Sequence, residues 1–171
     1  QILANGNANY PDVYALISLK DMKTYSVDYA LESSDNASNV DIKFYAYGGQ
    51  GVLRMYAIDG GNDTKCSEFK GKNGSVADME VQNKTRLLAV PGFDFDNATA
   101  ESISNAISAS NITSNKINPF VVGDIIAFKT ADTSTAGGGR IGVMKILSDT
   151  QVVSNNPTAR IITVSIKLPK K

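Results

Sequence analysis

The chain has 171 residues, of which 42% are hydrophobic and 20% are charged. This length fits one folded domain, since a single core usually organises roughly 100–200 residues, and the composition excludes an intrinsically disordered chain. Basic and acidic residues number 17 each, so the formal net charge is zero and no long-range field would attract a polyanion. We therefore expect no nucleic-acid partner.

The first nine residues, QILANGNAN, are polar and contain neither a charged nor an apolar targeting region. We interpret residues 1–9 as a flexible leader, from which a targeting segment was removed upstream, and residues 10–171 as a single globular domain. No apolar run approaches the roughly 20 residues that cross a bilayer. The abundance of Asn, Ser and Thr suits an exported β-protein, so we expect export without a transmembrane segment.

The first half of the chain predicts β-strands. Residues 14–19 and 24–27 are β-prone and are separated by a polar step, which predicts a hairpin, and residues 32–39 are predicted as a loop or one helical turn. Residues 40–47 alternate between apolar and polar side chains, which predicts a half-buried strand. The inward face of that strand is expected to carry Val40, Ile42, Phe44 and Ala46, and the outward face Asp41, Lys43, Tyr45 and Tyr47.

A glycine-rich turn at residues 48–51 leads to a predicted return strand at residues 52–58. Residues 59–83 are polar and rich in glycine, which predicts a long excursion on the surface. Residues 86–90 form a short predicted strand that ends at Pro91 and Gly92.

Apolar residues then recur at helical spacing, which predicts one short helix at residues 98–110, capped by Asp96 or Asn97. Strands are predicted at residues 120–130, 141–147 and 160–168. In the last strand the inward side chains are Ile162, Val164, Ile166 and Leu168. The fold class expected is mainly β to α+β, an antiparallel β-sandwich-like domain of about seven or eight strands with one short helix.

Histidine is absent and Cys66 is the only cysteine. Serine or cysteine catalysis through histidine, imidazole-based zinc sites and intrachain disulfides are therefore excluded. We expect no catalytic residues, no metal site and no cofactor, and no essential role for Cys66.

Carboxylates remain the alternative for catalysis, because a glycosidase needs two of them across a cleft. Asp94 and Asp96 alternate with phenylalanines, and we interpret them as a strand end leading into a helix cap. Gly137–Gly142 matches G-x-G-x-x-G as a string, but the sequence continues as a strand instead of opening a helix. We therefore interpret this glycine-rich segment as a flexible hairpin tip.

Tyr45 and Tyr47 are the candidate ligand-binding residues. Both belong to the predicted outward face of the strand at residues 40–47, and aromatic rings exposed on a sheet face can hold sugar rings. The alternative is that the two tyrosines cover a neighbouring loop or helix.

Three stretches resemble a known group of proteins: NVDIKFYAYG at residues 39–48, VGDIIAFKT at 122–130 and GVMKI at 142–146. They are similar to segments of secreted lipoproteins from Bacteroidetes gut bacteria. The resemblance implies export, an upstream lipid anchor and a place in the periplasm or on the outer cell surface, and it brings no catalytic residues. The chain departs from the group's pattern at residues 62–83 and 131–140.

These observations favour a non-enzymatic cell-envelope lipoprotein domain with a binding role, for which a glycan or another envelope protein is the expected partner. Two alternatives remain open. One is a carboxylate-dependent glycoside hydrolase, and the other is a structural adhesion or assembly module, which would need an unpaired edge strand.

Overall fold

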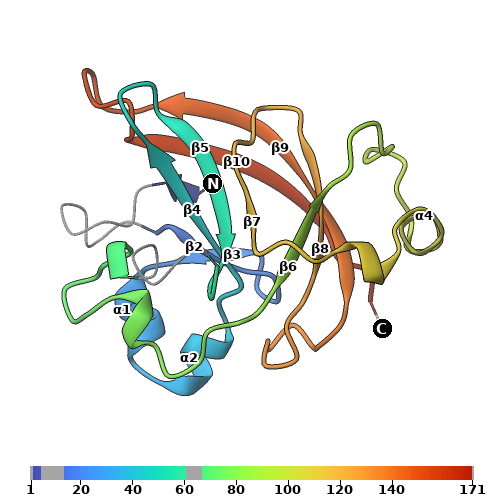
Figure 1. The fold of residues 1–171 in the computed structure, drawn as a ribbon, viewed down its shortest axis with the longest axis horizontal. Coiled ribbons are helices and arrows are strands. Elements are labelled where there is room, and N and C mark those ends of the chain that lie inside the picture. The colour runs from blue at the N-terminus through green and yellow to red at the C-terminus, as the bar shows by residue number, and fades with distance from the viewer. Residues whose placement is uncertain (1, 5–13, 61–66, 171) are drawn as a thin grey trace.

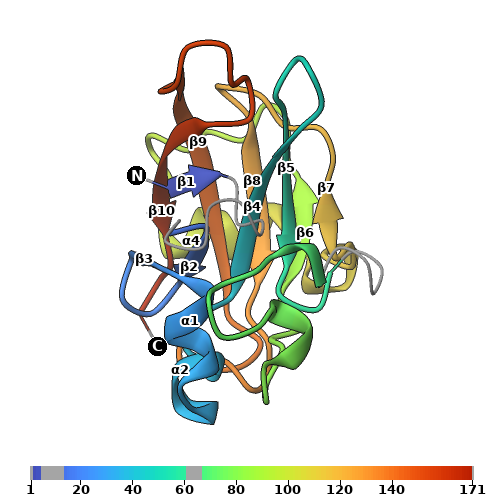
Figure 2. The same cartoon turned by 90° about the vertical axis from the view of Figure 1, so that its left-hand side faces the viewer.

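The computed structural model describes residues 2–4, 14–60 and 67–170, and their strands form two five-stranded antiparallel sheets (Figures 1 and 2). The first sheet has the order β1 (Ile2–Ala4), β10 (Arg160–Lys167), β9 (Ile141–Gln151), β8 (Ile125–Lys129) and β6 (Arg86–Ala89). The second has the order β3 (Lys23–Tyr25), β2 (Leu16–Ser18), β4 (Ile42–Tyr47), β5 (Val52–Ala57) and β7 (Lys116–Ile117). The predicted antiparallel sandwich is confirmed. The two strands that the sequence did not reveal, β1 and β7, are too short to show an alternation.

Helices lie on the outside of both sheets (Figure 1). Helices α1 (Val27–Leu31) and α2 (Ser34–Ser38) and the 3₁₀ turn η1 (Val76–Asp78) accompany the second sheet. Helix α4 (Ala100–Ala106), followed by the 3₁₀ turn η2 (Ala109–Asn111), packs on the first sheet. The molecule is therefore layered, with the two sheets between helical covers.

The main core lies between the sheets. Its buried side chains are Ile17, Leu19, Ile42, Phe44, Ala46, Leu53, Met55, Leu87, Phe120, Ile126, Phe128, Ala136, Met144, Ile146 and Ile162. Phe44 and Phe120 meet edge to face with ring centroids 6.0 Å apart, a geometry that aromatic pairs prefer. Phe128 packs its ring over Gly142, where a Cβ would come within 2.4 Å of the ring, so glycine is needed there for packing.

Strand β10 keeps its predicted alternation. Ile162 is fully buried, and Val164, Ile166 and Leu168 pack against the core while remaining partly exposed. The register on β9 shifts between Thr163 and Val164, and the extra residue is Leu147, which is 47% exposed. A bulge in β9 thus leaves the inward face of β10 unchanged.

The prediction of a half-buried strand at residues 40–47 is wrong, because β4 is covered on both faces. Of the four side chains expected outward, only Tyr47 is exposed, whereas Asp41 and Lys43 have no exposed surface. Lys43 donates a hydrogen bond from Nζ to the carbonyl oxygen of Ile58 at 2.6 Å. The cover is a second core that contains Ala15, Leu16, Val27, Ala30, Ala37, Val40, Tyr45, Tyr56, Ile58, Phe69, Val76 and Met79.

That second core also corrects the prediction for residues 59–83. In the described part of this segment Phe69 and Val76 are fully buried, so the chain crosses the outer face of β4 and β5 as a cover. Met79 is a third buried apolar side chain of this segment, and together with side chains of α1 and α2 these residues cover the outer face. Cys66 lies outside the described residues.

Local capping explains two further differences. Residue Val27, expected in a strand, begins α1 because Ser26 accepts a hydrogen bond from the backbone N–H of Tyr29 at 3.2 Å. The predicted helix at 98–110 is α4, and its cap is Thr99, not Asp96 or Asn97, since Thr99 and Ser102 form a capping box.

The predicted strand at residues 120–130 is β8 only from Ile125 onward. Before it the chain turns, because Asp124 accepts a hydrogen bond from the backbone N–H of Val121 at 2.9 Å. Phe120 anchors this turn in the main core.

Candidate functional site

The two predicted ligand-binding tyrosines do not form an exposed aromatic platform. Tyr45 is 8% exposed, and its ring centroid lies 5.5 Å from that of Phe69 in the second core. Tyr47 is 50% exposed, and the guanidinium of Arg54 lies 4.7 Å from its ring centroid. The structure therefore places one tyrosine in the core and leaves one on the surface.

The candidate carboxylates Asp94 and Asp96 both have local structural partners. Asp94 accepts hydrogen bonds from the backbone and the side chain of Asn97, which lower the pKa of Asp94 below its usual value. Asp96 forms an ion pair with Lys145 at 3.0 Å. A general acid needs a raised pKa, so Asp94 has the opposite of the required environment.

A buried polar network, which the sequence did not predict, centres on Asp41. Its carboxylate accepts hydrogen bonds from the backbone N–H of Leu19 at 2.8 Å, from Ser134 Oγ at 2.6 Å and from Asn83 Nδ2 at 3.3 Å. These three donors come from segments far apart in the sequence. Asp41 therefore joins the second sheet to two loops.

Asn83 is the second centre of this network and is also fully buried. Its Nδ2 donates to the carbonyl oxygens of Ser38 and Val40, both at 2.8 Å, and its Oδ1 accepts from Thr133 Oγ1 at 2.7 Å. Every polar atom of this amide thus takes part in a hydrogen bond, as burial requires.

The glycine-rich segment at residues 131–140 is tethered by these contacts. Besides the bonds made by Thr133 and Ser134, the Thr135 backbone N–H donates to the Ser38 carbonyl at 3.0 Å, and Thr135 Oγ1 donates to Asn39 Oδ1 at 2.5 Å. The hairpin is confirmed, because the segment connects the antiparallel strands β8 and β9, but residues 133–135 at its tip are held by hydrogen bonds to distant segments. The sequence concealed this because the threonines and the serine look like ordinary loop residues, and their partners lie 50 to 96 positions away.

The network extends from Asn39 toward α1. Asn39 Nδ2 donates to Asp21 Oδ2 at 2.6 Å and to Tyr29 Oη at 3.2 Å, and Tyr25 Oη donates to the same oxygen of Asp21 at 2.7 Å. The hydrogen bonds from Asn39 and Tyr25 lower the pKa of Asp21. The bond to Asp21 also raises the pKa of Tyr25 to about 12.

Asp41 has the opposite electrostatic character from Asp21. Burial raises the pKa of the Asp41 carboxyl to about 6, because the ionised form loses its hydration, while the bonds from Ser134 and Leu19 oppose that rise. Near neutral pH the site thus holds an ionised, dehydrated carboxylate surrounded by donors.

The outer side of the tethered loop forms one wall of a groove of about 680 Å³, which we call the polar groove. It is lined by Glu80, Val81, Gln82, Lys84, Lys129, Thr130, Ala131, Asp132, Thr133 and Gly139. Two carboxylates and two ammonium groups balance its charge. Because Thr133 is bonded to Asn83, this wall is held directly by the buried network.

Within residues 2–4, 14–60 and 67–170, no three acidic or cysteine side chains come together in a way that could hold a metal ion. Among the helices of that same part of the chain, none is long and apolar enough to cross a membrane.

Comparison with known proteins defines the class of fold. The structure is similar to the crystal structure of a DUF4466 family protein from Parabacteroides merdae ATCC 43184, a Bacteroidetes gut bacterium, with a TM-score of 0.63 and 16% sequence identity. The match covers 99% of this chain and 52% of that protein, so the chain spans about half of its length. At this identity the likeness shows a shared fold. No family model matches the sequence, and no curated protein does.

Proposed function

We propose that this chain is a non-enzymatic binding domain of an exported, lipid-anchored cell-envelope protein, and that it binds glycans in the polar groove. Its place in the envelope is supported by the similarity of residues 39–48 and 122–130 to secreted lipoproteins.

The observation that carries the binding role is the way the groove wall is held. Thr133 lies on the groove and is fixed by Asn83, which is itself fixed by two backbone carbonyls. A wall whose backbone is already ordered loses little conformational entropy when a ligand binds.

The chemistry of the lining favours a neutral, hydroxyl-rich ligand. The carboxylates of Glu80 and Asp132 can accept hydrogen bonds, and the ammonium groups of Lys84 and Lys129 can donate them. A sugar hydroxyl group both donates and accepts, so it can pair with either kind of side chain. A strongly charged ligand would meet as much repulsion as attraction there. Uncharged sugars therefore fit this mixed lining better than phosphates or peptides whose charges are all of one sign.

Hydrolysis is the weaker alternative. The carboxyl group whose pKa is raised, that of Asp41, has no exposed surface and is enclosed by its donors. A general acid must reach the bond it protonates, so Asp41 is not placed for that role.

A glycan array probed with the purified domain tests the proposal. Binding of a glycan that is weakened at least tenfold by Lys84→Ala and unchanged by Lys116→Ala, an exposed lysine away from the groove, would support it. A glycan whose binding is lost in Tyr47→Ala and unaffected by Lys84→Ala would move the site to the exposed tyrosine. Absence of binding to every glycan at millimolar concentration would refute the glycan role.

A further inference from the structure

A small pocket, which we call the arginine pocket, opens where helix α4 meets the end of the β8–β9 loop and the segment after β10. Its volume is about 250 Å³, and its apolar lining comprises Ala100, Ile103, Ile141 and Pro169. Its polar lining is Ser104 and Arg140, and Arg140 is the one charged side chain among the described residues that line it. Gly139 lines both this pocket and the polar groove, so the two hollows are neighbours.

The guanidinium of Arg140 is held in place by neutral groups. It donates from Nη1 to the carbonyl oxygen of Ala136 at 2.6 Å and from Nη2 to the carbonyl oxygen of Pro169. The backbone of Arg140 is fixed as well, since its N–H donates to Thr130 Oγ1 at 2.8 Å and its carbonyl oxygen accepts from the Thr130 N–H at 2.9 Å. The position of the charge is therefore set before a ligand arrives.

The charge of Arg140 has no counter-ion in the part of the chain that the structure describes, because none of the ion pairs there involves it. A guanidinium has five N–H groups, and the two carbonyl partners leave three of them for other acceptors. One of these is Nε–H, which is open to solvent, since Arg140 does not belong to the described side chains with a buried, unpartnered nitrogen or oxygen. A half-buried cation without a counter-ion keeps a desolvation cost, which an anionic ligand would offset.

The remaining lining suits a small apolar group. Ile103 is 2% exposed and packs with Ile141 in the cluster that joins α4 to the first sheet, so this wall is already ordered. The Ser104 hydroxyl donates to the Glu101 carbonyl at 3.0 Å and can rotate to donate to a ligand. A volume of about 250 Å³ equals that of roughly eight water molecules, so a fitting ligand has roughly eight non-hydrogen atoms.

We propose that the arginine pocket binds a small monocarboxylic acid, whose carboxylate pairs with Arg140 and whose apolar tail lies against Ile103 and Ile141. A planar carboxylate matches the planar N–H array of a guanidinium and balances its single charge. A phosphate would leave part of its larger charge uncompensated among apolar side chains. This ligand differs from the neutral sugar proposed for the polar groove, and neither proposal depends on the other.

The test titrates the isotope-labelled domain with sodium hexanoate, an acid of about this size, near neutral pH and follows the Nε–H signal of Arg140 by NMR. That signal should shift and saturate with a Kd on the order of 1 mM, the affinity expected of so small a ligand. Hexanamide has the same size without the charge, and acetate has the charge without the tail. Each should bind at least about tenfold more weakly than hexanoate.

Variants locate the binding, which is then followed by the backbone amide signal of Ile141 on the pocket wall. Arg140→Gln can still donate hydrogen bonds but has no charge, and it should weaken hexanoate binding at least about tenfold. If Arg140→Gln fails to fold, Ala100→Leu fills the pocket from α4 without changing Arg140 and should weaken binding as strongly. Its matched control is Ala106→Leu, at an exposed position of the same helix outside the pocket, which should bind as the wild type does.

Several results would overturn the proposal. Hexanamide could bind as tightly as hexanoate, or Arg140→Gln and Ala100→Leu could both leave binding unchanged. Tighter binding of N-acetyl-leucine, which mimics the last residue of a peptide, would replace the free acid by a peptide C-terminus. An Arg140 Nε–H signal that shifts on removal of Lys171, without added acid, would assign the pocket to the terminal carboxylate of the purified chain. Lys84→Ala should not alter hexanoate binding, so this test is independent of the polar groove.

Discussion

Ser134 Oγ lies 2.6 Å from Asp41 Oδ1, although the two residues are 93 positions apart in the sequence. This bond fastens the loop after β8 to the buried start of β4. Because the Asp41 carboxylate is dehydrated, its donors stabilise a charge that water cannot reach. The loop and the sheet should therefore respond together to the ionisation of Asp41.

The first prediction concerns pH. The folded-state pKa of Asp41, about 6, lies above its unfolded value of 3.8, so the folded state binds the proton more tightly. The stability that this gives is fully present below pH 3.8 and is lost as pH rises through 6. The loss should be about 3 kcal/mol of unfolding free energy, since one pKa unit is worth roughly 1.4 kcal/mol.

Urea denaturation of wild type and Asp41→Asn between pH 3.5 and 8 measures this effect, in steps of about half a pH unit. The difference in unfolding free energy between the two proteins should change with pH and level off above about pH 7. Taking the difference removes the contribution of other carboxylates, such as Asp21, whose pKa is lowered. A difference that stays constant across the range would show that Asp41 titrates normally in the folded protein.

The second prediction concerns Asn83. Replacement by Ala removes its hydrogen bonds to Ser38, Val40 and Thr133 and leaves buried carbonyl groups unsatisfied. The cost should be about 2–4 kcal/mol, and amide exchange at Thr135 should accelerate as the loop loosens. Gln82→Ala, a neighbouring change at a partly exposed position, is the matched control. Unchanged exchange at Thr135 in Asn83→Ala would mean that the loop is held by its other contacts.

Prediction from sequence correctly placed inward side chains in strands where apolar and polar residues alternate without interruption. The alternation of β10 correctly placed Ile162 and Val164 inward, because side chains of a strand alternate whatever covers them. The alternation of β4 likewise separated Ile42, Phe44 and Ala46, which lie in the main core, from Tyr45, but Val40, predicted to point inward with them, belongs to the second core. What it could not tell was that the polar face, with Asp41 and Lys43, is also buried.

The reason is physical. Burial of a polar strand face depends on cover from elsewhere, and here the cover includes Phe69 and Val76, two apolar residues isolated in a polar, glycine-rich stretch. Isolated apolar residues of this kind form no periodic sequence pattern, so the sequence does not show that they are buried. The buried network was hidden for the same reason, since Asp41, Asn83 and Ser134 meet only through long-range packing.

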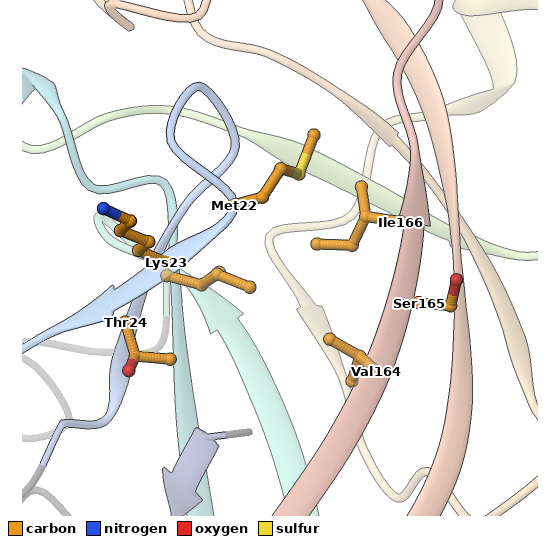
Figure 3. A pocket seen from close by; sticks show the side chains of 7 residues that line it. Met22, Lys23, Thr24, Val164, Ser165 and Ile166 are labelled. Atoms are coloured by element: carbon orange, nitrogen blue, oxygen red, sulfur yellow. The ribbon is translucent and has the colours of Figure 1, made fainter.

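The third prediction compares two inward residues of β10. Ile162→Ala should cost about 2–5 kcal/mol, the transfer term plus the cavity left in a sealed core. Ile166→Ala should cost about 1–2 kcal/mol, because Ile166 is partly exposed on the wall of a surface groove between β3 and β10 (Figure 3), where water can fill the space. Chemical denaturation of both variants gives the two values. Equal costs would show that Ile166 is sealed from water in solution.

The last prediction concerns catalysis and uses Asp94 and Asp96, the carboxylates that the sequence singled out. Asp94 is held ionised by Asn97, and Asp96 is paired with Lys145 at the surface. We expect the purified domain to hydrolyse no common polysaccharide or peptide. The double variant Asp94→Asn, Asp96→Asn should alter stability rather than any activity, and loss of the exposed Asp96 pair should contribute no more than about 1 kcal/mol.

Reducing-sugar and peptide-release assays on both proteins, alongside thermal unfolding, provide the measurement. Lys116→Ala, a substitution on β7 and not at either carboxylate, is purified and assayed in the same way, so that a change common to all variants is recognised. Turnover of a defined glycan by the wild type, abolished in the double variant while its unfolding transition is retained, would establish a carboxylate-dependent hydrolase in place of the binding domain. Such a result would also require an acid with a raised pKa within reach of substrate, a property that the surroundings of Asp94 oppose.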